Sequence, residues 1–138
     1  MRSAVTPPKP TLASIARAAG IGIGVAILLN VILYFVATGA GWLPAPTSMG
    51  TVITIVPVLM FSIVPSILGA VVYFAITRYI SPMARANHIF AIVASIVLVV
   101  MAASPLGLAA PTVGTAMTLE IMHLAAGLPL IYTLTKMA

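Results

Sequence analysis

The chain has no cysteine and only one acidic residue among its 138 positions, and both shortages exclude classes of protein. Without cysteine there is no disulfide, no thiolate metal site, no iron–sulfur ligation and no cysteine nucleophile. Charged residues make up 5% of the sequence, against about 25% in soluble domains, while hydrophobic residues make up 62%. With a mean hydropathy of +1.27, the chain has too little polar surface to cover a globule in water. The composition therefore predicts a small integral membrane protein.

The basic residues are thinly spread, and each stands next to an apolar run. They are Arg2, Lys9, Arg17, Arg78, Arg85 and Lys136. Nucleic-acid binding needs basic residues gathered on one solvated face, so this distribution argues against a nucleic-acid partner despite the pI of about 10.3. The spread is typical of the charges that set membrane topology.

Four apolar stretches are each long enough to cross a hydrocarbon core, which needs about 20 helical residues. They run over residues 18–38, 51–77, 86–103 and 112–135. None of them shows the alternation of polar and apolar residues that a barrel strand would have. The predicted fold is an all-α membrane protein, a four-transmembrane-helix up-down-up-down bundle that forms one domain over residues 11–138.

The segments outside the spans predict the orientation of the bundle. Residues 1–10 form a Pro-rich tail that we expect to be disordered, and Thr11 is the predicted N-cap of the first helix. Basic residues flank the tail, the linker at 80–85 and the C-terminus, whereas the linkers at 39–50 and 104–111 have none. The positive-inside rule then predicts that both termini are cytoplasmic, as in a multi-pass protein of a bacterial inner (plasma) membrane.

Small residues recur at four-residue spacing in the first span, where they favour close helix contacts in lipid. One row contains Gly20 and Gly24. An adjacent row runs Ala18, Gly22, Ala26 and Asn30. We favour packing within the four-helix bundle as the role of these rows, and the alternative is a homodimer or a larger membrane complex formed through Gly20 and Gly24.

Three prolines fall within the predicted spans. Pro57 and Pro65 in the second span are each expected to free a carbonyl one turn earlier and to bend the helix, and Pro129 in the fourth span is read in the same way. Such kinks are tolerated in membrane helices, so we interpret them as structural features.

Polar residues from all four spans are predicted to lie at similar depth. Counting about 1.5 Å per residue places them roughly 12–16 Å from the outer end of their spans. They are Asn30, Ser62, Ser95, Glu120 and His123. A carboxylate at such a depth costs at least about 2.5–3.5 kcal/mol, so Glu120 is expected to face inward. Two interpretations remain open, a hydrogen-bonded clasp between helices and a proton- or ligand-binding site.

Other chemistry lacks the residues that it needs. Glu120 and His123 make half of a di-iron motif, but that site requires further carboxylates. His88 lies too near the end of its span to share one haem with His123. The sequence has no Ser-His-Asp set, phosphate loop or HExxH motif. We therefore predict no metal, no cofactor and no enzymatic activity.

The fourth span carries the segment Leu119-Glu120-Ile121-Met122-His123-Leu124. On this segment the chain resembles an uncharacterised family of small bacterial four-span membrane proteins, a domain of unknown function. The resemblance implies the architecture and no activity. The chain is also similar in size, span number and lone membrane acid to the small multidrug-resistance exporters, but their acid lies in the first helix, where this chain has Asn30.

Two functional hypotheses follow. The first is a structural or accessory subunit that binds another membrane protein or lipid through its helix faces. The alternative is a small proton-linked transporter or permease that uses Glu120 and His123 at the membrane midplane. We favour the first, because short linkers in a chain of 138 residues leave little room for a substrate path.

Overall fold

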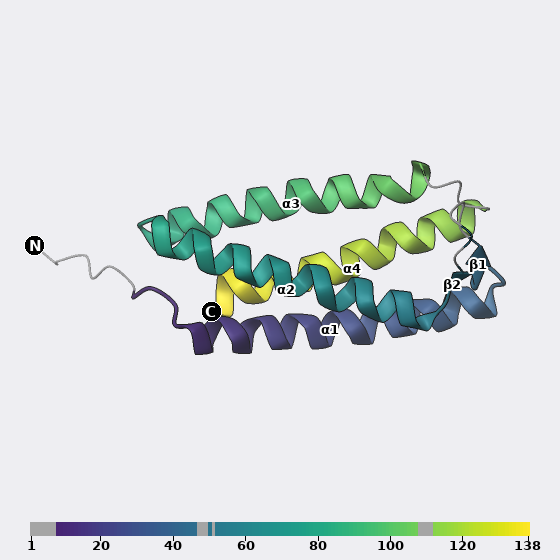
Figure 1. Cartoon of the computed structure of the whole chain (residues 1–138), viewed down its shortest axis with the longest axis horizontal. Helices are drawn as coiled ribbons and strands as arrows, with labels where there is room; N and C mark the ends of the chain where they lie inside the picture. The colour runs from purple at the N-terminus through teal and green to yellow at the C-terminus, as the bar shows by residue number, and fades with distance from the viewer. Residues whose placement is uncertain (1–7, 47–49, 51, 108–111) are drawn as a thin grey trace, which may run out of the picture.

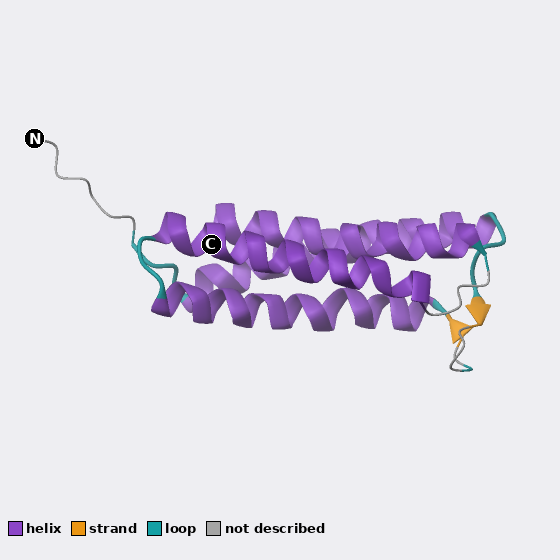
Figure 2. Cartoon of the chain, turned by 90° about the horizontal axis from the view of Figure 1, so that it is seen from above, coloured by secondary structure: helices purple, strands orange, loops and turns teal. Residues whose placement is uncertain are grey.

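The computed structural model describes residues 8–46, 50, 52–107 and 112–138, the side chains of 104–107 excepted. It contains four long helices and a short pair of strands that joins the first two helices (Figures 1 and 2). In chain order these are α1 Leu12–Gly39, β1 Ala45–Pro46, β2 Val52–Ile53, α2 Ile55–Tyr79, α3 Met83–Gly107 and α4 Val113–Met137. The four helices are long and apolar enough to cross a membrane, as the composition predicts.

Successive helices run in opposite directions, so the bundle has two distinct ends (Figure 1). The start of α1, the α2–α3 turn and the C-terminus lie at one end, which we call the basic end because Lys9, Arg78 and Arg85 belong to it. The two strands lie at the other end, where Ala45 pairs with Ile53 and Pro46 with Val52 in antiparallel register. We call this the strand end.

Both ends of the bundle have helix caps that use threonine. Thr11 is in an extended conformation and its side chain accepts a hydrogen bond from the Ser14 backbone N–H, which confirms the predicted N-cap of α1. Thr112 does the same for α4 by accepting from the Thr115 N–H. Each cap pairs one of the backbone N–H groups that a helix start leaves without a partner.

The third helix is longer than predicted at both ends. It begins at Met83, so the predicted linker at 80–85 is confined to residues 80–82, and it continues to Gly107 through Ser104 and Pro105, where we expected a turn. Residues 108–111 of that predicted turn lie outside the described residues. A helix near the end of a span retains its internal hydrogen bonds because lipid offers no alternative partner for the backbone, and this overrides the turn tendency of Ser-Pro.

Pro57 does not free a carbonyl, contrary to the prediction. It lies in the first turn of α2, after Thr54 at the N-cap, where a backbone N–H has no partner within the helix in any case. Pro65 and Pro129 do lie inside helices, as predicted.

The buried apolar side chains form two clusters, one toward each end. The cluster toward the basic end comprises Ile15, Ala18, Ala19, Tyr73, Phe90, Leu130 and Leu134. The cluster toward the strand end comprises Ala37, Leu43, Ala45, Val58 and Met122. Buried polar side chains of α1 and α2 lie between them along those helices, and these are Asn30, Ser62 and Ser66.

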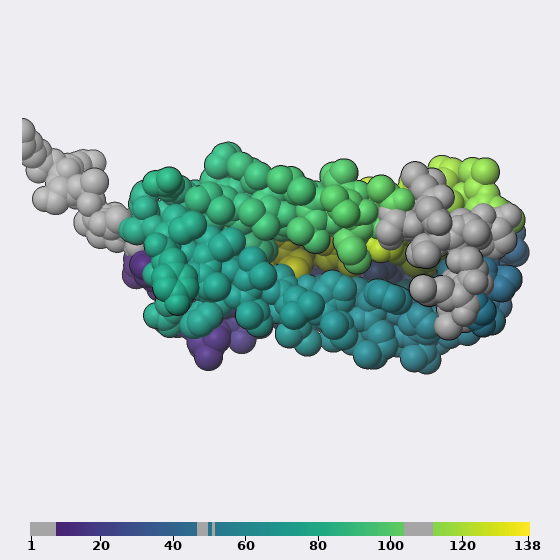
Figure 3. All heavy atoms as spheres, turned by 45° about the horizontal axis from the view of Figure 1, so that its top comes forward, coloured from purple at the N-terminus to yellow at the C-terminus, as the bar shows by residue number. Residues whose placement is uncertain are grey.

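The helices do not pack evenly. The contact between α1 and α4 is the most extensive in the bundle, and α3 packs on α4 much more than on α2. The space-filling view shows the consequence, a furrow between α2 and α3 through which α4 is visible (Figure 3). The arrangement therefore buries α1 and α4 most and leaves much of α3 exposed.

Candidate functional site

The centre of the bundle contains a hydrogen-bonded polar group that links α1 to α2. Asn30 is 3% exposed and Ser62 is 0% exposed, and Asn30 Nδ2 donates to Ser62 Oγ at 2.8 Å. Ser62 Oγ donates in turn to the Val58 carbonyl at 2.8 Å, and Ser66 Oγ donates to the Ser62 carbonyl at 2.7 Å. The serines thus satisfy their hydroxyl groups on their own helix, and Asn30 adds the bond between helices.

One atom of this group is not satisfied. Asn30 Oδ1 is buried and has no hydrogen-bond partner among the described residues. An unpaired buried acceptor costs about 1–3 kcal/mol, so Asn30 is held in place by packing as well as by its bond to Ser62.

The fourth helix carries the other two predicted residues, but they do not pair with each other. His123 Nδ1 lies 2.6 Å from the carbonyl oxygen of Leu119, four residues earlier, so Nδ1 carries the hydrogen and donates it to its own helix. Glu120 is half-buried and forms no hydrogen bond or ion pair within the part of the chain that the structure describes. Glu120 and His123 therefore do not bond to each other, and neither side chain bonds to Asn30.

Ser95 does not join the polar group. Its side chain is exposed on α3, whereas Asn30 and Ser62 are buried. The predicted depth of Ser95 assumed that the third span ends at 103, and the helix continues to Gly107. Four more residues at about 1.5 Å each move Ser95 roughly 6 Å farther from the strand end than the count from the sequence gave.

A second polar group lies toward the basic end and was not predicted. Tyr73 Oη donates to Asn87 Oδ1 at 2.8 Å, and Asn87 Nδ2 donates to the Thr135 carbonyl at 3.1 Å. Tyr73 also packs edge-on against Phe90, with 4.9 Å between ring centroids. These contacts join α2, α3 and α4. The signal in the sequence was the pair of polar side chains near facing ends of two consecutive spans, Tyr73 before the linker and Asn87 after it.

The two rows of small residues in α1 have different surroundings. A Cβ added at Gly22 would lie 2.6 Å from Thr133 Oγ1 and 3.0 Å from Leu130 Cα, so this row packs directly on α4. At Gly20 and Gly24 an added Cβ would meet nothing within 4 Å, and both residues are exposed. The internal packing that we favoured holds for the row through Gly22, and the row of Gly20 and Gly24 faces out of the bundle.

At the strand end, a single aromatic side chain closes the contact between α1 and α4. Trp42 follows α1, and a Cβ added at Gly114 would lie 2.6 Å from three atoms of its indole ring. The Trp42 carbonyl accepts a hydrogen bond from Thr115 Oγ1 at 2.8 Å. An indole at the end of a span is typical of the membrane interface.

The described residues offer no ligand set for a metal ion, since no three His, Cys, Asp or Glu side chains gather within them. What the geometry does define is a small multi-pass membrane protein with four candidate spans, joined internally by two polar groups and by small-residue contacts. The chain belongs to the family of unknown function DUF6069, whose family model matches residues 10–138. This confirms the resemblance read from the sequence. No curated protein and no solved structure matches the chain.

Proposed function

We propose that this protein is a non-enzymatic accessory subunit of the plasma (inner) membrane, which binds another membrane protein through the outer face of α1. The observation that carries the proposal is the pair Gly20 and Gly24, exposed and with no atom of the chain near the position of an added Cβ. In lipid, helices associate by close backbone contact at small residues, and two glycines one turn apart provide such a surface.

The interior gives less support to proton-linked transport. Glu120 has no hydrogen-bond partner among the described residues, and the His123 Nδ1 hydrogen is used by the Leu119 carbonyl. Asn30 and Ser62 bond to each other and not to the acid. A relay would need these groups in contact, so the arrangement favours an interior that serves to hold the helices together.

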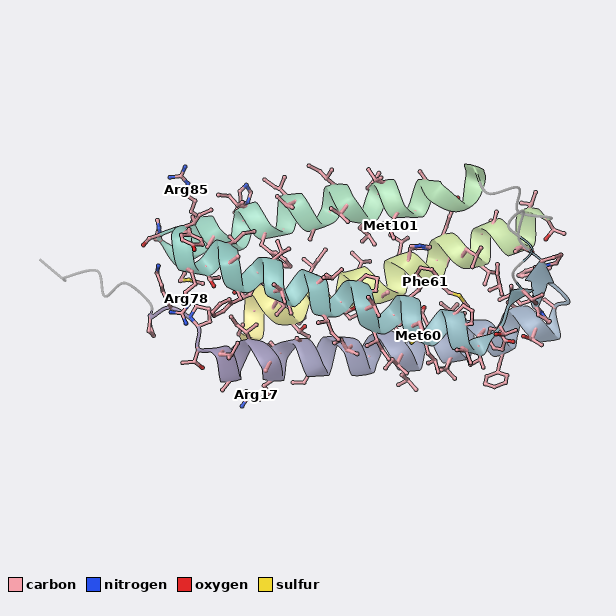
Figure 4. The ribbon with its side chains drawn as sticks, viewed as in Figure 1. Arg17, Met60, Phe61, Arg78, Arg85 and Met101 are labelled. Carbon is pink, nitrogen blue, oxygen red and sulfur yellow. The ribbon has the colours of Figure 1, made fainter. Side chains whose placement is uncertain are left out.

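Orientation is part of the proposal, with both termini on the cytoplasmic side. Its support is that Arg78 and Arg85 lie at the same end of the bundle (Figure 4), and that Lys9 lies there too because its Nζ donates to the Arg78 carbonyl. The positive-inside rule assigns this end to the cytoplasm. Because the chain has no native cysteine, Ser81→Cys at this end and Ala40→Cys at the other can be labelled separately with an impermeant reagent. Labelling of position 40 in intact cells with position 81 protected is expected, and the reverse pattern would overturn the orientation.

Docking on α1 can be tested by placing a photoreactive residue at position 24 in cell membranes. The expected result is a crosslinked adduct with another membrane protein, and a Gly20→Leu substitution should abolish it because the larger side chain holds the partner helix away. Gly20→Ala serves as the milder control and should retain most of the adduct.

A matched position for the same photoreactive residue is Ile96 on α3, which is 59% exposed and has the large side chains Ile92 and Val100 one turn away on either side. It should give lipid adducts and no protein adduct. A protein adduct from position 96 equal to that from position 24, or none from position 24, would contradict the proposal.

A further inference from the structure

An apolar groove runs between α1 and α2 in the half of the bundle that contains the basic end. Its volume is about 360 Å³, and every side chain that lines it is apolar. On α1 the lining extends from Leu12 to Ile23, and on α2 it includes Ala70 and Phe74. Leu12 is 65% exposed, so the groove opens on the surface of the bundle.

The groove is long enough for most of an acyl chain in one leaflet of a bilayer. Its lining spans roughly 16 Å on α1, from Leu12 to Ile23, and roughly 10 Å on α2, from Ile67 to Phe74, at about 1.5 Å per residue. Half of a hydrocarbon core of about 30 Å is about 15 Å. An extended acyl chain of the leaflet at the basic end therefore has a groove of suitable length beside it.

Two cationic side chains lie where the groove meets the basic end. The Arg78 guanidinium lies over the ring of Phe74, 4.8 Å from its centroid, and Phe74 lines the groove. Lys9 Nζ donates to the Arg78 carbonyl at 2.8 Å, which brings the ammonium to the same place. Figure 4 shows Arg78 at this end of the bundle, whereas the Arg17 side chain points outward from α1 and Arg85 lies on α3 at the other side of the same end.

These cations retain hydrogen-bond donors for a ligand. A lysine has three N–H donors and an arginine five. Lys9 uses one donor on the Arg78 carbonyl, and the other donors of both side chains have no acceptor within the described part of the chain. The only acidic side chain of the protein, Glu120, belongs to α4, which begins at the strand end. The two positive charges are thus not compensated by an acidic side chain nearby.

We propose that this groove binds an anionic phospholipid, with one acyl chain along Ala70 and Phe74 and the headgroup phosphate on Lys9 and Arg78. Apolar lining selects a hydrocarbon chain, and two unpaired cations at its end select a negative headgroup. A second copy of the chain is disfavoured as the occupant. Two copies have the same orientation in a membrane, so a dimer across this groove would place the cationic side chains of both copies close together. Repulsion between these like charges opposes such a dimer.

The test measures lipid retention by the purified full-length protein in detergent, by native mass spectrometry with phosphatidylglycerol and phosphatidylcholine of identical acyl chains. The wild type should retain phosphatidylglycerol preferentially. Lys9→Gln and Arg78→Gln should each reduce this preference roughly fivefold, from about 1 kcal/mol per basic residue near an anionic surface. Arg85→Gln is the matched control, because it removes a charge from the same end away from the groove, and it should leave the preference unchanged.

A second variant tests the chain-binding part of the site. Ala70→Phe fills the groove from α2 and should lower retention of both lipids, while unchanged retention would overturn the assignment of the acyl chain to this groove. Equal loss of preference in Arg85→Gln would indicate general electrostatic attraction and would also overturn the proposal. If Ala70→Phe instead changes the oligomer size with no effect on lipid, the groove is a protein interface. Gly20 of the docking face also lines the groove, so it is left unchanged in all of these variants, and none of their outcomes depends on the docking of a partner at Gly24.

Discussion

Replacing Gly22 by alanine should destabilise the bundle, although the same change two residues later, at Gly24, should not. The new Cβ would lie 2.6 Å from Thr133 Oγ1 and 3.0 Å from Leu130 Cα, and the second of these is a backbone atom that moves only if α4 moves. Overpacking of this kind costs about 1–3 kcal/mol. Gly24→Ala is the matched control, because an added Cβ there meets nothing within 4 Å.

The comparison isolates packing from helix propensity. Alanine is favoured over glycine in a helix by about 1 kcal/mol, and this gain applies equally at both positions. The difference in unfolding free energy between Gly22→Ala and Gly24→Ala should therefore be about 1–3 kcal/mol. Adding Thr133→Ala to Gly22→Ala should recover part of the loss, because it removes the closest atom.

The assay is thermal or denaturant unfolding in a mild detergent, followed by circular dichroism. Equal stability of Gly22→Ala and Gly24→Ala would refute the reasoning, since it would mean that α1 does not pack on α4 through Gly22. A loss at Gly24 greater than that at Gly22 would refute it more strongly by assigning the internal contact to the other row.

Three further results are expected. Gly114→Ala should shift the fluorescence emission of Trp42, the only tryptophan, because the new methyl group would lie 2.6 Å from the indole ring and must displace it. Unchanged emission would mean that the ring does not cover Gly114. A double-mutant cycle with Asn30→Ala and Ser62→Ala should give a coupling free energy of about 0.6 kcal/mol, the average for hydrogen bonds between membrane helices. A coupling free energy of zero would mean that the bond between them does not stabilise the bundle. Neither Glu120→Gln nor Glu120→Leu should lower the free energy of unfolding by more than about 0.5 kcal/mol, because no partner is lost. A larger loss in the leucine variant would restore the clasp hypothesis.

The number and rough extent of the helices could be predicted because lipid imposes a simple rule. A span must be long, apolar and internally hydrogen-bonded, so each apolar run corresponds to one helix. The same rule explains the error at the end of the third span. Ser104 and Pro105 are typical of a turn in water, but α3 continues through them to Gly107.

The contacts between helices were harder to predict, because rotation about the helix axis decides them. The row through Gly22 and the row through Gly20 are close on one helix, and both have the spacing that favours association. Their separate roles depend on which of them faces Thr133 of α4, and this is set by the packing of all four helices. Small-residue spacing alone does not contain that information.

Rotation about the helix axis also decides which of the predicted polar residues make contacts between helices. Asn30 and Ser62, which we predicted only to lie at similar depth, are on the faces of α1 and α2 that meet, and a hydrogen bond joins them. Ser95 is on an exposed face of α3, and a depth estimate gives no information about the direction in which a side chain points. Tyr73 and Asn87 were not predicted because they lie toward the basic end and not at the depth of the other polar residues, and there they join three helices.

The most direct test of a docking face on α1 is the size of the complex that the protein forms in native membranes after gentle solubilisation. The double variant Gly20→Leu, Gly24→Leu should reduce the complex to the free subunit, while the same two positions changed to alanine should retain it. Glu120→Gln should leave the complex intact, because the acid takes no part in docking. A complex that survives the two leucines, or that is lost in Glu120→Gln, would contradict the account.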